Sequence, residues 1–285
     1  MKKDSTDRRL FIRSSVLACL GLSFSELSAA PNFLYSETIS SRNIPEYFPN
    51  IDPQLINEVV GKSHFDLEGV KKLVDRRPEL SKSVWEWRFG DFESAIGAAS
   101  HVGRRDIVKY LISKGASPTL FTFAMLGSFD IVKSTIEFYP GIQKVAGPHG
   151  ISLLAHAHSG ERMKDQMTST EIVQLEKTID YLKSLKDADG DTYLDIGQEE
   201  QQKYIGDYKY GNKEYEGFSI SLNMRKMLSL GPIGEFGGAL YRIGEHQFIY
   251  NGAPSVTITF NVEEGKVKSL MLKDPDVAIE AKKIS

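Results

Sequence analysis

The stretch that most constrains the fold of this chain covers residues 94–118 and reads SAIGAASHVGRRDIVKYLISKGASP. It predicts two short helices, at residues 94–102 and 106–114, with a break at Gly103 and a stop at Gly115. The apolar positions of the second helix recur at helical spacing, at Ile107, Val108, Leu111 and Ile112. One such helix pair cannot bury its own apolar face, so the pattern demands similar neighbours in the chain.

The same stretch resembles the ankyrin repeat, whose pattern is T-P-L-H-x-A-A-x-x-G-H-x-x-I-V-x-x-L-L-x-x-G-A-x-P. The equivalent positions are Ser94, Ile96, Ala99, Ser100, Gly103, Ile107, Val108, Leu111, Gly115, Ala116 and Pro118. Gly97 and Arg104 stand where the pattern usually has His. The resemblance implies a solenoid of stacked helix pairs that binds a protein partner through a concave surface.

Neighbouring repeats are present, and all of them are imperfect. SFDIVKSTIEF at residues 128–138 repeats RDIVKYLI, and the step from Asp106 to Asp130 is 24 residues (130 − 106), shorter than the ~33 of a full unit. The missing residues are those of the projecting β-turn, so this third repeat is expected to begin at Pro118, with its first helix at 120–126. Residues 149–160 resemble the start of a fourth repeat, with an insertion at 161–169 and a second helix at about 170–185. Residues 66–80 read as a degenerate first repeat after a helix at 54–63, as in a capped solenoid.

The N-terminus resembles a twin-arginine export signal. Arg8 and Arg9 are followed by Leu10, Phe11, Ile12 and Arg13, and residues 1–30 run from a charged start through an apolar middle to a small-residue end. An amphipathic helix that happens to hold two arginines is the alternative. The signal predicts a periplasmic or otherwise exported protein.

Composition limits the classes of partner. The chain has 35 basic and 38 acidic side chains, and removal of residues 1–30 leaves 30 against 35. A net charge near −5 does not favour nucleic acid or an anionic membrane surface, and no apolar run is long enough to stay in a membrane after signal removal. The single cysteine, Cys19, lies in the signal, so the mature chain is expected to form no disulfide or thiolate metal site.

Residues 83–94, SVWEWRFGDFES, are expected to form the projecting finger of the second repeat. Trp85, Trp87 and Phe89 alternate with charged residues at the period of a strand. These aromatic side chains either cover the ends of the inner helices or anchor a partner, since Trp and Arg are enriched at interface hot spots. The candidate binding residues are Trp85, Trp87, Arg88, Phe89 and Asp91.

Two candidate metal patterns are interpreted as structural. His156 and His158 lie two apart on a predicted helix and point in different directions, so with His149 they read as structural or surface histidines. His101 falls where ankyrin helices meet the hydrogen-bond network between repeats. Asp187, Asp189 and Asp191 have calcium-loop spacing, but Gly190 and Gln198 stand at the wrong positions, which favours an acidic turn.

From residue 199 a different pattern begins. Short alternating runs separated by glycines predict a small antiparallel β-barrel or meander with seven strands, at residues 206–210, 218–223, 227–230, 239–243, 246–250, 256–261 and 266–272. This part resembles the small β-domain appended to some β-lactamase-related serine hydrolases. The residues that carry the likeness are Tyr204, Gly206, Tyr208, Phe260, Gly265, Lys266, Val267 and Leu270.

The expected fold class is α+β and multidomain: a signal peptide at 1–30, a linker at 31–53, about four imperfect ankyrin repeats at 54–186, an acidic linker at 187–198 and an antiparallel β-domain at 199–285. The whole chain resembles bacterial exported ankyrin-repeat proteins. Nucleophile-elbow, Walker and H-E-x-x-H motifs are absent from the sequence, so no cofactor is supported. The first hypothesis is therefore a non-catalytic module that binds a protein partner.

Two other classes stay open. One is a small-ligand or glycan binder that uses the barrel, with the repeats as scaffold, and an apolar cavity inside the barrel would favour it. The other is an enzyme with its site at the domain junction, and converging His, Asp or Ser side chains there would favour it.

Overall fold

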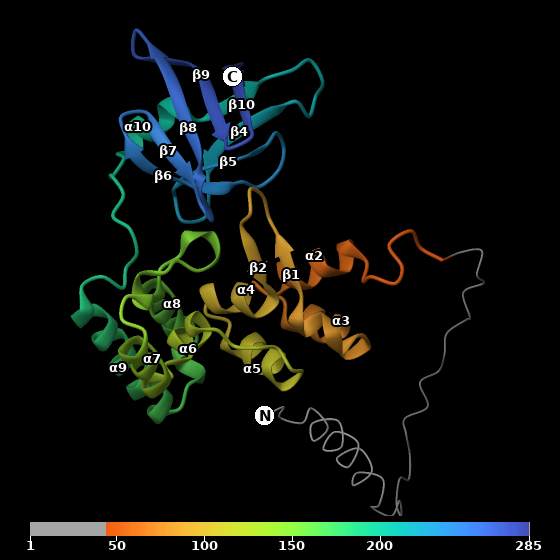
Figure 1. The fold of residues 1–285 in the computed structure, drawn as a ribbon, viewed down its shortest axis with the longest axis vertical. Helices are drawn as coiled ribbons and strands as arrows, with labels where there is room; N and C mark the ends of the chain where they lie inside the picture. The colour runs from red at the N-terminus through yellow and green to blue at the C-terminus, as the bar shows by residue number, and fades with distance from the viewer. Residues whose placement is uncertain (1–43, 285) are drawn as a thin grey trace, which may run out of the picture. The chain divides into compact units, whose positions relative to one another are not determined.

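Four consecutive helix pairs make up the first half of the described chain. The computed structural model describes residues 44–284, so the predicted export signal with Arg8 and Arg9 lies outside the described residues. The pairs are α2 (Pro53–Lys62) with α3 (Leu67–Arg76), α4 (Ala95–His101) with α5 (Arg105–Ser113), α6 (Leu120–Leu126) with α7 (Phe129–Phe138), and α8 (Leu153–Ser159) with α9 (Ser169–Leu185). The first helices of the pairs pack on one another in chain order, α2 on α4, α4 on α6 and α6 on α8 (Figure 1).

Side-chain caps and glycines fix where these helices begin and end. Ser94 accepts a hydrogen bond from the Gly97 N–H at the start of α4, and capping boxes begin α6 at Thr119 and α9 at Thr168. Gly127 ends α6 in the left-handed conformation, at φ 72°. The helices predicted at 94–102, 106–114, 120–126 and 170–185 are thereby confirmed to within about two residues. Short 3₁₀ turns lie between the helices, at η2 (Pro78–Lys82), η3 (Ile142–Lys144), η4 (Pro148–Gly150) and η5 (Gly160–Gln166).

The predicted finger is a two-stranded hairpin that connects the first two pairs. Strand β1 (Val84–Glu86) pairs antiparallel with β2 (Phe92–Ser94), and Trp85 lies opposite Glu93. The turn between the strands holds Phe89 at φ 54° and Gly90 at φ 78°. Because side chains alternate along a strand, Asp91 and Glu93 are buried while Phe92 between them is 64% exposed.

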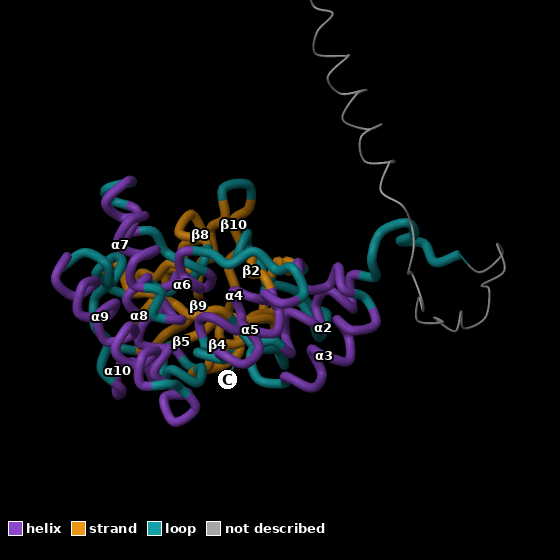
Figure 2. The backbone as a smooth tube through the Cα atoms, turned by 90° about the horizontal axis from the view of Figure 1, so that it is seen from below, coloured by secondary structure: helices purple, strands orange, loops and turns teal. Residues whose placement is uncertain are grey.

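The second half of the described chain is a closed antiparallel barrel. Residues 187–197 have no regular structure and lead into α10 (Gln198–Tyr204). The strands are β3 (Gly206–Lys209), β4 (Gly217–Leu222), β5 (Leu228–Pro232), β6 (Gly238–Gly244), β7 (Gln247–Tyr250), β8 (Ala253–Glu263), β9 (Lys266–Asp274) and β10 (Val277–Lys283). They close in the order β10-β3-β4-β5-β6-β7-β8-β9. In Figure 2, where helices are purple and strands orange, the helix pairs follow one another from α2 and α3 on the right to α7 and α9 on the left.

The α+β class and the barrel are therefore confirmed, with one correction. The sequence predicted seven strands, and the described residues contain an eighth strand in the barrel, β10. This strand was missed because the apolar residues of VAIEAKK do not alternate with polar ones: Val277, Ala278 and Ile279 are consecutive, and only Ala281 is fully buried. It pairs with both β9 and β3, so it is the strand that closes the barrel.

Side chains fill the barrel and the helical layer separately. Every barrel strand contributes a buried apolar side chain to the barrel core, and its largest fully buried side chains are Tyr208, Phe248 and Tyr250 from the strands and Tyr204 from α10. The described residues from Pro49 on belong to one compact unit, and residues 44–48, in a unit of their own, form a short turn closed by the Phe48 N–H and the Pro45 carbonyl, 3.0 Å apart. Within residues 44–284, none of the helices combines the length and apolar character needed to span a membrane.

Candidate metal centre

Four side chains from different elements converge on one point in the helical layer. His64 follows α2, Glu93 lies in the middle of β2, His101 is the last residue of α4, and His149 lies in the η4 turn. Each offers one nitrogen or oxygen atom, and these atoms all lie within 4.8 Å of one another. We call these four residues the His–Glu cluster.

The separations within the cluster suit a small cation at its centre. The Glu93 Oε1 atom lies 3.0 Å from the His101 Nε2 atom and 3.2 Å from the His149 Nε2 atom. The Glu93 Oε2 atom lies 3.4 Å from the His64 Nε2 atom. A tetrahedral zinc ion with bonds of about 2.0–2.1 Å holds its donor atoms about 3.3–3.4 Å apart. The three Glu93–His distances are close to that value, and all four donor atoms lie within 4.8 Å of one another.

Two atoms of the cluster are buried without a hydrogen-bond partner. The Glu93 side chain is 0% exposed and the His101 side chain 10% exposed, yet neither Glu93 Oε1 nor His101 Nε2 forms a hydrogen bond in the described structure. They face each other, but the angles are not those of a hydrogen bond. A buried charge without compensation is costly. A cation between the two atoms would satisfy both.

Further contacts hold the cluster side chains with their free donor atoms turned inward. The His64 Nδ1 atom lies 3.0 Å from the Gly61 carbonyl oxygen, and the His149 Nδ1 atom lies 2.7 Å from Asp91 Oδ2. The Trp87 indole N–H donates to Glu93 Oε2 over 2.8 Å. Histidines that bind a metal almost always donate their other ring N–H to a carboxylate or carbonyl in this way. The arrangement of these contacts is therefore the one expected around a metal.

Burial and charge perturb the titration of the cluster in opposite directions. Burial alone would lower the pKa of His149, but the hydrogen bond to Asp91, the close contact with Glu93 and the charges of both carboxylates raise it to about 10. Burial lowers the pKa of His101. Burial would raise the pKa of Glu93, but the close contacts of its carboxylate with the His101 and His149 imidazoles, and their charges, hold it well below its usual range. The two carboxylates thus favour positive charge at the centre.

Local backbone geometry accounts for two of the cluster positions. The alternation of β2 puts Asp91 and Glu93 on the same buried face. His149 lies in the left-handed region at φ 59°, ψ 23°, followed by Gly150 at φ 67°. A non-glycine residue in that region is uncommon and is found most often where the surrounding structure enforces it. His149 is held there by contacts to Asp91 from both its backbone and its ring.

The five residues predicted to bind a partner all make contacts within the chain. Trp85 packs against the helical core, and Trp87 donates to Glu93. Arg88 pairs with Glu235 and donates to the Phe236 carbonyl, Phe89 packs edge-on against Tyr250 at 4.9 Å between ring centroids, and Asp91 is 3% exposed. Partner binding by these residues stays a prediction.

Of the histidines, sequence reasoning weighed a metal at His149, His156 and His158, and among these only His149 belongs to the cluster. His156 is buried beside it, with its Nδ1 atom 2.8 Å from the Ser152 carbonyl, and burial lowers its pKa to about 4. His158 is 41% exposed and pairs with Glu161. His64, Glu93 and His101 were missed as a group. The sequence signal that could have found them is Asp91-Phe92-Glu93, whose two acidic side chains share one face of a strand, followed by a histidine, His101, at the end of the next helix.

The acidic turn at residues 187–191 is separate from the cluster. Asp187 accepts hydrogen bonds from the Gln143 amide at 3.1 and 3.0 Å and lies 3.5 Å from the Lys144 Nζ atom. Asp189 accepts one from the Ser152 hydroxyl at 3.1 Å. These contacts join the turn to the last helix pairs.

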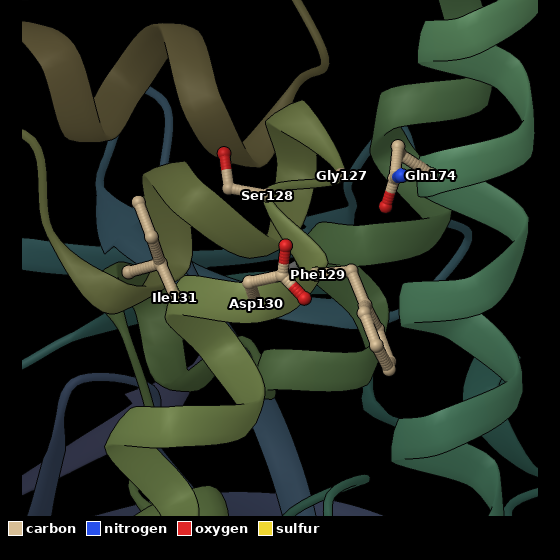
Figure 3. Close-up of a pocket in the computed structure, with 6 residues that line it drawn as sticks. All are labelled: Gly127, Ser128, Phe129, Asp130, Ile131 and Gln174. Carbon is tan, nitrogen blue, oxygen red and sulfur yellow. The ribbon is translucent and has the colours of Figure 1, made fainter.

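A small hollow lies at the start of α7 (Figure 3). Its volume is about 230 Å³, and its lining is Gly127, Ser128, Phe129, Asp130, Ile131 and Gln174. That volume is below the ~300 Å³ at which ligand pockets usually begin, and Asp130 is the only charged group in the lining. The hollow shares no residue with the His–Glu cluster, so the cluster is the stronger candidate site.

A scan against protein-family models finds no match to this sequence, and a search of curated proteins finds none either.

Proposed function

We propose that this protein binds one divalent transition-metal ion of the zinc class through His64, Glu93, His101 and His149. The observation that carries the proposal is the convergence of four donor atoms, two of which, Glu93 Oε1 and His101 Nε2, are buried without a hydrogen-bond partner. Three imidazoles suit zinc, copper, iron or nickel, whereas calcium and magnesium prefer shells made only of oxygen. Zinc also accepts a mixed set of nitrogen and oxygen donors in tetrahedral geometry.

The four protein donors favour a structural metal site over a catalytic one. Catalytic zinc sites keep one of four positions for water or substrate, whereas structural sites fill all four with protein donors. Here three imidazoles and one carboxylate fill the set. The ion would join α2, the finger, α4 and η4, and an ion bound only by the folded chain stabilises it by about 2.7 kcal/mol at a hundred times its dissociation constant.

The test is zinc titration of the Glu93→Gln variant, measured by competition with a chromophoric chelator. Gln keeps the shape of the side chain and an oxygen that accepts from Trp87, but it removes the charge. We expect the zinc affinity to fall at least ~100-fold, since even residues in the outer shell cost 10–100-fold. The matched control is His158→Gln, because His158 is exposed and lies outside the cluster. Equal affinity for wild type and Glu93→Gln would refute the proposal.

We also propose that the helix pairs are imperfect ankyrin repeats and that the exported protein carries a surface for a protein partner. The successive packing of α2, α4, α6 and α8 supports this, as does the interval of 24 residues (129 − 105) between the starts of α5 and α7. In the finger, Val84 is 52% and Phe92 64% exposed, so these side chains are accessible to a partner. The barrel-ligand alternative gains no support, because aromatic side chains occupy the barrel interior.

A pull-down from a periplasmic extract tests this second function, with the chain from residue 31 as bait. A retained protein should be lost when Val84 and Phe92 are changed together to Ser. Retention that is unaffected by this change would exclude the finger as the binding surface, and no retained protein would count against the interaction module.

A further inference from the structure

The outer shell of the His–Glu cluster includes residues of the barrel, a part of the chain that supplies none of the four donor atoms. Asn251, in the turn between β7 and β8, donates from its side-chain amide to Asp91 Oδ2 over 2.9 Å and is 3% exposed. The Tyr241 hydroxyl, on β6, donates to the His149 carbonyl over 3.2 Å. The first contact ends on Asp91, which holds the His149 ring, and the second ends on the His149 backbone itself.

Asp91 connects the barrel to the donor atom of His149. Its Oδ1 atom accepts from the His149 backbone N–H at 3.0 Å, and its Oδ2 atom lies 2.7 Å from the His149 Nδ1 atom. The same Oδ2 atom accepts the bond from Asn251. A carboxylate bound to the far nitrogen of an imidazole fixes the ring orientation and raises the basicity of the other nitrogen. Asn251 therefore acts on the metal position through Asp91 and His149.

The turn between β7 and β8 of the barrel packs tightly against the Asp91 side chain. A Cβ atom added at Gly252, which has φ +71°, would lie 2.4 Å from Asp91 side-chain atoms. Beside it, Phe89 at the tip of the finger packs on Tyr250, and Arg88 pairs with Glu235. The finger thus carries Glu93 at one end and the barrel contacts at its tip.

We infer that the barrel acts as a metal-coupled clamp, in which Asn251 and Tyr241 position His149 for the ion, and the bound ion in turn holds the barrel against the helices. This inference rests on the proposed metal function. Coupling between two binding events is reciprocal, so each raises the affinity of the other by the same factor. Loss of either barrel contact is expected to weaken zinc binding although every donor atom is still present.

The test compares zinc affinities of full-chain wild type, Asn251→Ala and Tyr241→Phe by chelator competition. We expect a 10–100-fold loss for Asn251→Ala, the range found for outer-shell partners of metal ligands, and a smaller loss for Tyr241→Phe. The control is Asn261→Ala, because Asn261 is an exposed residue of β8 whose side-chain amide donates to Glu263, outside the cluster. The control should bind zinc like wild type.

A second readout detects the clamp itself. Residues 187–197 connect the two parts, and there Tyr193 stacks on Tyr241 at 4.5 Å between ring centroids, while the Leu194 N–H donates to the Arg242 carbonyl. Zinc should slow protease cleavage of this segment in wild type and in Asn261→Ala. It should have little effect in Glu93→Gln or Asn251→Ala. A purely structural role for Asn251 would change cleavage equally with and without zinc.

The outcomes separate the two proposals. If wild type binds no zinc, the metal function fails and the clamp fails with it. The metal function stands if wild type binds zinc and Glu93→Gln does not. In that case the clamp alone is refuted if both barrel variants bind zinc like wild type and zinc does not change the rate of protease cleavage. Should Asn251→Ala lose its circular dichroism spectrum, Tyr241→Phe decides, since it removes a single hydroxyl and keeps the stacked ring.

Discussion

Glu93 is a fully buried carboxylate surrounded by three imidazoles and an indole. A buried carboxylate is strongly unfavourable unless it is paired and hydrogen-bonded. The Trp87 N–H satisfies its Oε2 atom, but its Oε1 atom has no hydrogen-bond partner in the described structure. A cation bound beside Oε1 would satisfy the oxygen that the Trp87 N–H leaves without a partner.

The two tryptophans of the chain should respond differently to substitution. Trp85→Ala removes a half-buried ring from the helical core and should cost about 2–4 kcal/mol of unfolding free energy, below the 3–5 of a fully buried ring, with zinc affinity kept. Trp87→Phe keeps a ring but removes the donor to Glu93, so zinc affinity should fall about tenfold with stability nearly kept. Denaturant unfolding measures the stability of each variant, and zinc titration measures its zinc affinity. An unchanged unfolding curve for Trp85→Ala would restore Trp85 as a candidate binding anchor.

At the scale of elements, the helices were predictable and the closure of the barrel was not. The repeat of R-D-I-V-K and F-D-I-V-K gave α5 and α7 because an amphipathic helix repeats its apolar positions locally. Strand β10 lacks the alternation of a half-buried strand, because its apolar residues Val277, Ala278 and Ile279 are consecutive and it is placed by pairing with β3 and β9. A strand whose place depends mainly on pairing with neighbouring strands cannot be recognised from its own residues alone.

The start of α9 should make stability depend on pH. Glu171 accepts from Lys109 on α5 and from the Thr168 backbone at the cap, and these hydrogen bonds lower its pKa to about 2. Since the pKa of Glu171 in the folded protein lies below its ordinary value of 4.5, the contribution to stability is present above pH 4.5 and is lost as pH falls toward 2. Glu171→Gln should therefore melt below wild type at pH 7, and the gap should close between pH 4.5 and 2. Melting curves at several pH values check this, and a gap independent of pH would contradict it.

At the scale of the whole molecule, the site joins segments that no local pattern connects. Its donors come from the first two helix pairs, the finger and the η4 turn, and two of its supports come from the barrel. The sequence identified the finger and noted His101 and His149 singly, but their convergence depends on how successive pairs stack. The chain was divided from sequence at an acidic linker, 187–198, and the contacts of Asn251 and Tyr241 cross between the two parts that this linker connects.

The central claim is the identity of the donor atoms, and X-ray absorption at the zinc edge measures it most directly. The full chain, stripped with a chelator and loaded with one equivalent of zinc, should show four nitrogen or oxygen neighbours at about 2.0–2.1 Å. The outer-shell scattering of about three imidazole rings should accompany them, and Glu93→Gln should lose this signature at the same zinc concentration. A shell of six oxygens without imidazole scattering, or the same spectrum in Glu93→Gln, would contradict the account.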